Sequence, residues 1–162
     1  MNRESILLVE DDADEIHLMK RALAKAGLSN PLNVITHGGE VIPYFEGKGP
    51  YADRTQYPLP GLVFLDLKLP GISGLYLLAW IKGNPDHRHI PVVLFTSSDD
   101  PEDLRRAYQF GANSYLIKPM EFVEFVEMIK VTGTYWINLN STPTTVRRRK
   151  PVASSRAAAK KA

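Results

Sequence analysis

Four short apolar runs in this chain end on polar residues that can carry chemistry. The residues that follow the runs are Glu10, Asp11 and Asp12 after the first, Asp66 after the second, Thr96 after the third and Lys118 after the fourth. If the runs are neighbouring parallel strands, their carboxyl ends lie along one edge of a sheet, where open α/β sheets bind ligands. The sequence therefore predicts one crevice that holds carboxylates, a hydroxyl and an ammonium.

The chemistry that these groups could perform together is phosphoryl transfer. Carboxylates at one edge repel each other unless a cation or a shared proton relieves the repulsion, and oxygen ligands without His or Cys favour Mg²⁺ or Mn²⁺. Asp66 could act as a nucleophile, because a carboxylate can accept a phosphoryl group. Mg²⁺ on one side and Lys118 on the other would neutralise that group, while Thr96 would bind a remaining oxygen.

Each residue also has a structural interpretation. Acidic residues directly after a strand often cap the next helix, and an aspartate such as Asp66 can lie in a solvated turn. Thr96 and Lys118, taken singly, fit ordinary strand ends. The combination favours chemistry, because all four kinds of residue fall at the ends of separate runs.

Hydrophobic periodicity predicts five strands that alternate with five helices. We expect strands at residues 6–9, 33–36, 62–66, 91–95 and 114–117, and helices at 13–26, 40–46, 75–82, 101–110 and 121–136. Asp12 is a predicted N-cap, Asp100 or Asp99 is predicted to cap the helix at 101–110, and Gly27 and Gly111 are predicted helix ends. The fold class is therefore α/β, with a doubly wound five-stranded parallel sheet. Chain length favours the flavodoxin-like order 2-1-3-4-5, which brings Asp11 and Asp66 to adjacent strands.

Composition limits the class of protein further. The chain has 162 residues, of which 44% are apolar, enough for one globular domain with its own core. No apolar run reaches the roughly 18 residues that cross a bilayer, and the first residues do not resemble a signal peptide, so we expect a cytoplasmic protein without membrane insertion. The absence of cysteine excludes disulfides and thiolate metal sites.

The four motifs resemble the receiver domains of two-component response regulators. The resemblance covers residues 4–137 and rests on Leu8-Val9-Glu10-Asp11-Asp12, on residues 65–74, on Phe95-Thr96-Ser97-Ser98 and on residues 111–119. It implies that Asp66 is the phospho-acceptor and that Asp11 binds Mg²⁺ directly, with Glu10 acting largely through water. The Asp66 carboxylate and the Lys68 backbone carbonyl would complete the protein ligands.

The same resemblance implies how a signal is produced. Thr96 and Lys118 would contact the phosphoryl group, and the Lys118–Pro119 bond would be cis, as is usual in this family. Thr96 and Tyr115 would form a switch that alters the surface of the fourth helix, fifth strand and fifth helix. Without the resemblance, Tyr115 is interpreted as a half-buried aromatic residue at a strand end.

A narrower resemblance is to the single-domain response regulators associated with bacterial phytochromes. It rests on the long loop at residues 48–60, the His-x-His-Ile-Pro segment at 87–91 and the Tyr135-Trp136 pair. It implies a histidine kinase partner, such as a bacterial phytochrome, and a homodimer formed through the fourth-helix, fifth-strand and fifth-helix face. Phe122, Tyr135 and Trp136 could contribute to that face, or they could instead simply cover the sheet.

We expect a receiver domain at residues 1–140 and a basic, flexible tail at 141–162. The tail carries seven basic residues and no acid, and its Arg147–Lys150 run could also attract nucleic acid or an anionic surface. His87 and His89 are predicted to lie in a solvated loop rather than to bind a metal.

Two other function classes stay open. An aspartyl-phosphate hydrolase would share the acceptor chemistry, but such enzymes usually have an aspartate where this chain has Lys68. A module without phosphorylation could bind through the basic tail. In the leading interpretation the chain is not an enzyme, beyond catalysing its own phosphorylation and dephosphorylation.

Overall fold

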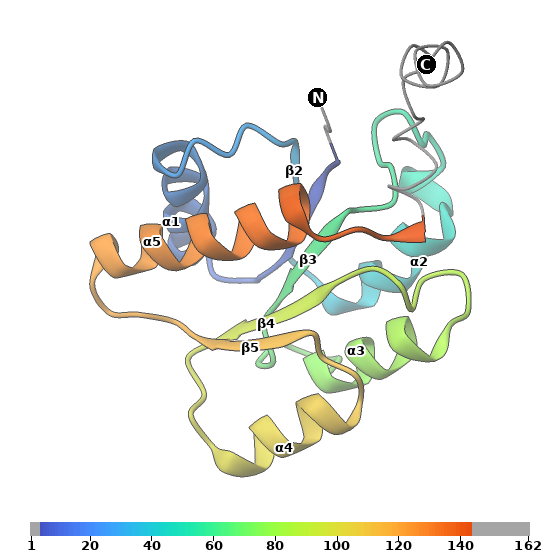
Figure 1. Cartoon of the computed structure of the whole chain (residues 1–162). Helices are drawn as coiled ribbons and strands as arrows, with labels where there is room; N and C mark the ends of the chain where they lie inside the picture. Colours follow the sequence, from blue (N-terminus) through green and yellow to red (C-terminus); the bar gives the residue numbers. More distant parts are fainter. Residues whose placement is uncertain (1–3, 144–162) are drawn as a thin grey trace, which may run out of the picture.

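The computed structural model describes residues 4–143, in which the strands form a single five-stranded sheet (Figure 1). The strands are β1 (Ile6–Val9), β2 (Leu32–Ile35), β3 (Leu62–Leu65), β4 (Val92–Thr96) and β5 (Ser114–Ile117). All neighbouring pairs are parallel, in the order β2-β1-β3-β4-β5. The predicted flavodoxin-like order is confirmed.

Helices cover both faces of the sheet (Figure 1). They are α1 (Ala13–Lys25), α2 (Val41–Glu46), α3 (Gly74–Gly83), α4 (Pro101–Gln109) and α5 (Phe122–Gly133). Side chains of β1 alternate between two cores: Ile6 and Leu8 pack with α1 and α5, while Leu7 and Val9 pack with α2 and α3. Because both faces are covered, all four residues of β1 are buried, as in most parallel sheets.

The ends of α1 and the start of α4 follow the predicted capping chemistry. The Asp12 carboxylate accepts hydrogen bonds from the amides of Asp14 and Glu15, and Asp100 accepts one from the Glu102 amide. Gly27 follows α1 with a φ of 73°, a left-handed conformation that glycine adopts without steric cost. These local signals fix where α1 begins and ends.

The last helix differs from the prediction. Its α-helical part ends at Gly133 and continues as a π-helix, η3 (Thr134–Leu139), rather than as an α-helix to Trp136. The Thr132 hydroxyl donates a hydrogen bond of 2.7 Å to the Met128 carbonyl just before this change. Such a side-chain hydrogen bond competes with the backbone hydrogen bonds of the helix. Together with the weak helix propensity of Gly133, this competition accounts for the change from an α-helix to a π-helix.

The long loop after α2 is fastened by one arginine. Arg54 Nη1 donates to the carbonyls of Tyr44 (2.7 Å) and Tyr57 (2.9 Å), and Nη2 donates to that of Phe45 (2.6 Å). Tyr44 and Phe45 lie in the last turn of α2, where carbonyls lack the usual helical partner, and the Tyr44 carbonyl also accepts a 3.2 Å hydrogen bond from the Gly47 amide. A short 3-10 turn, η2 (Gly49–Tyr51), begins the loop.

Within residues 4–143, none of the helices combines the length and apolarity needed to cross a bilayer. The predicted basic tail lies outside the described residues apart from positions 141–143. Its role and the domain boundary at residue 140 stay predictions.

Candidate functional site

Strand pairing brings the predicted reactive residues to one edge of the sheet. β1 and β3 are paired in register up to their last residues, so Glu10 and Asp66 leave neighbouring strands at the same level. On the other side, the Lys118 amide donates a 2.8 Å hydrogen bond to the Thr96 carbonyl, which extends the pairing of β4 with β5 to this edge. The sequence prediction that these four residues share one edge is confirmed.

At the centre of the site, the Lys118 ammonium bridges two carboxylates. Its Nζ lies 2.7 Å from Glu10 Oε2 and 3.0 Å from Asp66 Oδ2. None of the three side chains is more than 10% exposed. Buried charges are stable only when they are paired and hydrogen-bonded, and here one cation serves two acids.

Burial and the shared ammonium give the two carboxyl groups different acidities. Burial raises the pKa of Glu10 to about 7, against the opposing hydrogen bonds from Lys118 and the Asp12 amide. Burial alone would also raise the pKa of Asp66, but the charge of Lys118 and hydrogen bonds from Glu10, Lys118 and the Lys68 amide lower it below its usual value. The two carboxyl groups therefore titrate as a coupled pair, in which Lys118 favours the ionised form of Asp66 while burial disfavours the ionised form of Glu10.

The Thr96 side of the site is connected to α4 and β5 through Ser98. Thr96 is completely buried, and its Oγ1 accepts a 3.3 Å hydrogen bond from the Ser98 amide. The Ser98 hydroxyl donates to Asp103 Oδ2 in α4 at 2.6 Å, and the Ser98 carbonyl accepts a 2.9 Å hydrogen bond from the Tyr115 hydroxyl in β5. Ser98 was not predicted as a site residue. Its partners lie in α4 and β5, and the sequence does not indicate how these elements pack around Ser98.

The predicted metal ligands are only partly brought together. Asp66 and Glu10 are adjacent, but Asp11 is exposed, and residues 4–143 contain no group of three acidic or histidine side chains arranged as metal ligands. The donor set of carboxylates and the Lys68 carbonyl consists of hard oxygen atoms, which fits Mg²⁺ or Mn²⁺. In this arrangement the cation that the two acids share is the Lys118 ammonium.

The prediction of a cis Lys118–Pro119 bond is wrong for this structure, because residues 4–143 contain no cis peptide bond. The trans form of an X–Pro bond is lower in energy by about 0.5–1 kcal/mol. Lys118 reaches Glu10 and Asp66 from this trans backbone, so the observed contacts do not need the cis form.

The predicted solvated environment is also wrong for His87. Its side chain is 7% exposed and packs against Phe45 and Trp80, with ring centroids 5.2 and 5.7 Å away. The aromatic residues of α2 and α3 close over the ring and exclude water. His89 is partly exposed, and neither histidine belongs to a metal-binding group within residues 4–143.

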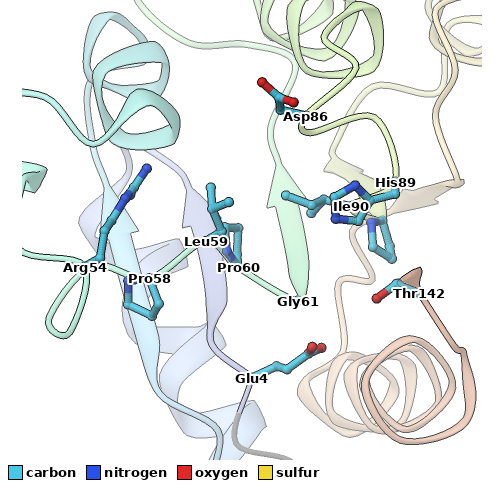
Figure 2. Close-up of a pocket in the computed structure, with 11 residues that line it drawn as sticks. Glu4, Arg54, Pro58, Leu59, Pro60, Gly61, Asp86, His89, Ile90 and Thr142 are labelled. Atoms are coloured by element: carbon cyan, nitrogen blue, oxygen red, sulfur yellow. The ribbon is translucent and has the colours of Figure 1, made fainter. Parts of the chain in front are cut away.

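A separate cavity of about 470 Å³ lies at the opposite, amino-terminal edge of the sheet (Figure 2). Glu4, Gly61 and Pro91, which precede β1, β3 and β4, form part of its wall, and Thr142 closes one side. Arg54 also borders it, but the guanidinium is already bound to three backbone carbonyls. Because this cavity does not contain Asp66 or Lys118, it is not the site of the predicted phosphoryl chemistry.

The fold and the Glu10–Lys118–Asp66 centre define a doubly wound α/β protein of the receiver class. The family model for the response regulator receiver domain matches residues 6–130, and the chain belongs to this family. It is therefore a signalling protein of two-component systems.

Several known proteins are similar over most of the chain. A probable methanogenesis regulatory protein, FilR2 of Methanothrix harundinacea, is 37% identical, with 85% of this chain and 86% of that protein aligned. Among solved structures, the phosphorylated cyanobacterial phytochrome response regulator RcpA matches with a TM-score of 0.80 at 30% identity, over 87% of this chain and 99% of that one. The Mn²⁺-bound form of response regulator Rcp1 matches with a TM-score of 0.77 at 31% identity, over 86% and 99% of the two chains.

Proposed function

We propose that this protein accepts a phosphoryl group on Asp66 from a histidine kinase, in a Mg-dependent phosphorelay. The observation that carries the proposal is the hydrogen bond between Lys118 Nζ and Asp66 Oδ2. It keeps the carboxylate ionised, as the lowered pKa of Asp66 reflects, and it places a cation where negative charge would accumulate.

In the proposed transfer, a carboxylate oxygen of Asp66 attacks the phosphorus atom of a phosphohistidine. A phosphorus–oxygen bond forms, the phosphorus–nitrogen bond breaks, and the imidazole leaves with the electron pair of the broken bond. Lys118 neutralises the transferred group, and the Thr96 hydroxyl turns from Ser98 toward one of its oxygens. Mg²⁺, held by Glu10, Asp11, Asp66 and the Lys68 carbonyl, would supply the remaining charge neutralisation.

We infer that the kinase is a phytochrome-type histidine kinase. Two structures with TM-scores of 0.80 and 0.77 support this inference, since one is a phosphorylated phytochrome response regulator and the other is the related Rcp1 with bound Mn²⁺. The similar protein FilR2 is named for the regulation of methanogenesis and not for a phytochrome. The identity of the kinase is therefore a separate question from whether Asp66 is phosphorylated.

We further propose that the protein forms a homodimer through α4, β5 and the start of α5. This face carries large apolar side chains that are at least 40% exposed: Leu104, Tyr108, Ile117, Met120 and Val123. Phe122 offers less surface to a partner, because it is partly buried and packs against the core beside α1, with Arg21 4.5 Å from its ring centroid. Light scattering should report a dimer, which Val123→Glu should weaken; a monomeric mass with and without phosphorylation would contradict the proposal.

Phosphorylation itself is tested with wild type, Asp66→Asn and Asp86→Asn. Each protein is incubated with acetyl phosphate and Mg²⁺, and its intact mass is measured. Wild type and Asp86→Asn, in which an exposed aspartate is changed, should gain one acid-stable, base-labile phosphoryl group, and Asp66→Asn should gain none. An unmodified wild type would refute the proposal. Sustained turnover of phosphomonoesters would instead support an aspartyl-phosphate hydrolase.

A further inference from the structure

A third carboxylate faces the Lys118 ammonium from outside the sheet. Glu15 lies in the first turn of α1, and its Oε2 is 3.7 Å from Lys118 Nζ. This distance is too long for a hydrogen bond, but two opposite charges this close attract each other appreciably. Sequence reasoning missed Glu15, because an acid in the first turn of a helix is already explained by the helix dipole.

The surroundings of this pair reduce its screening by solvent. The Lys118 side chain is 10% exposed and that of Glu15 is 32% exposed. A pair that is partly buried at both ends is less screened than a pair on the open surface. Lys118 is thus drawn toward α1 by Glu15 and toward the end of β3 by Asp66.

Phosphorylation of Asp66 would change the balance between these attractions. A phosphoryl group brings close to two negative charges and three acceptor oxygens, so Lys118 would have to turn toward it. Glu15 opposes this change in two ways, because it attracts the ammonium and repels the incoming anion. We propose that Glu15 is a positioning residue that restrains Lys118 on the α1 side of the site and slows the phosphorylation of Asp66. This inference rests on the proposed function, since it concerns the rate of the same transfer.

The neighbouring Asp14 provides a matched control. It is the other acidic residue in the first turn of α1, but it is exposed and forms no ion pair with Lys118 in the described part of the chain. Asp14→Asn therefore removes one negative charge from the same helix turn, with the same loss of dipole stabilisation, while leaving the Lys118 surroundings intact.

The experiment compares wild type, Glu15→Gln, Glu15→Asp and Asp14→Asn in the full-length protein. Phosphorylation by acetyl phosphate with Mg²⁺ is followed by intact mass at low salt and at 1 M salt. We expect Glu15→Gln to be phosphorylated about threefold faster than wild type at low salt, with a smaller difference at 1 M salt, because salt screens only the solvent-facing part of this partly buried pair. Glu15→Asp, which retains the charge, and Asp14→Asn should stay close to wild type.

The outcomes separate this inference from the proposed function. If wild type is not phosphorylated at all, the proposed function fails. If wild type is phosphorylated and Glu15→Gln matches it, or if Asp14→Asn accelerates the reaction equally, the positioning role of Glu15 is refuted.

Discussion

The Tyr115 hydroxyl donates a 2.9 Å hydrogen bond to the backbone carbonyl of Ser98, and this bond ties β5 to the loop after β4. The Ser98 hydroxyl extends the connection to α4 through its 2.6 Å bond with Asp103. Thr96 enters the same network through the Ser98 amide. A movement of Thr96 therefore reaches two elements of the proposed output face through a single residue.

Ser98→Ala should loosen the start of α4. The substitution leaves Asp103 without its serine partner and removes the acceptor of the Asp100 amide, so we expect a loss of about 1 kcal/mol in unfolding free energy. Hydrogen exchange should become faster in the first turn of α4. Ser97→Ala is the control, because Ser97 is exposed; equal exchange in the two variants would contradict the proposed connection.

Gly74→Ala should displace the phospho-acceptor. A Cβ at Gly74 would collide with the Asp66 carbonyl and come within 2.7 Å of the Leu67 Cα, and these backbone atoms cannot move without moving Asp66. We expect a loss of about 1–3 kcal/mol in unfolding free energy, together with slower phosphorylation. Gly83→Ala, at the other end of α3, has nothing within 4 Å of the new Cβ and should leave both measurements close to wild type.

Arg54→Met should release the long loop from α2. The variant keeps most of the apolar stem but loses three hydrogen bonds from a charged donor to backbone carbonyls. We expect a loss of about 2 kcal/mol in unfolding free energy and faster proteolysis within residues 48–60. Arg88→Met, which changes an exposed arginine, is the matched control. Unchanged proteolysis in Arg54→Met would show that the aromatic contacts alone hold the loop.

His87→Phe should reduce the loss of stability on acidification. Burial lowers the pKa of His87 below its usual value. The charge of Asp86 raises the pKa by a smaller amount, and the charge of Arg54 lowers it slightly further. Below a pH of about 6.5 the unfolded chain therefore binds this proton more readily than the folded protein does, and stability falls as the pH falls. The variant also removes a buried Nδ1 atom that has no hydrogen-bond partner in the described residues.

The measurement is the unfolding free energy of wild type and His87→Phe between pH 5 and pH 8. The difference in unfolding free energy between the two proteins should be constant above pH 7. Below pH 6.5 the variant should become more stable relative to wild type. Parallel curves over the whole range would mean that His87 does not titrate differently in the folded and unfolded states. Contributions from Glu10 are common to both proteins and cancel in the difference.

The sequence was sufficient to place Glu10, Asp66, Thr96 and Lys118 at one edge, because strand ends are signalled by local patterns and parallel strands share their direction. The cap at Asp12 was predicted for the same reason, since a cap depends on residues two or three positions away, and Asp100 is one of the two adjacent aspartates predicted to cap α4. Local periodicity therefore determined most of the framework of the site.

Contacts that depend on how helices and loops pack were not predicted from the sequence. The three carbonyls bound by Arg54, the aromatic enclosure of His87 and the approach of Glu15 to Lys118 all depend on how helices and loops pack. The cis Lys118–Pro119 bond came from family resemblance alone, and the structure does not contain it. The exposed position of Asp11 likewise depends on the geometry of the turn into α1, which its residue type does not determine.

Lys118 is separated from Glu10 by 108 residues and from Asp66 by 52. During synthesis, a nascent chain that has not yet reached β5 already contains both acids but lacks their cation. Its first three strands would bring two carboxylates side by side with no ammonium between them, so pairing of that edge is less favourable until the fifth strand supplies Lys118. The phospho-acceptor site would thus be complete only after the last strand of the sheet has been synthesised.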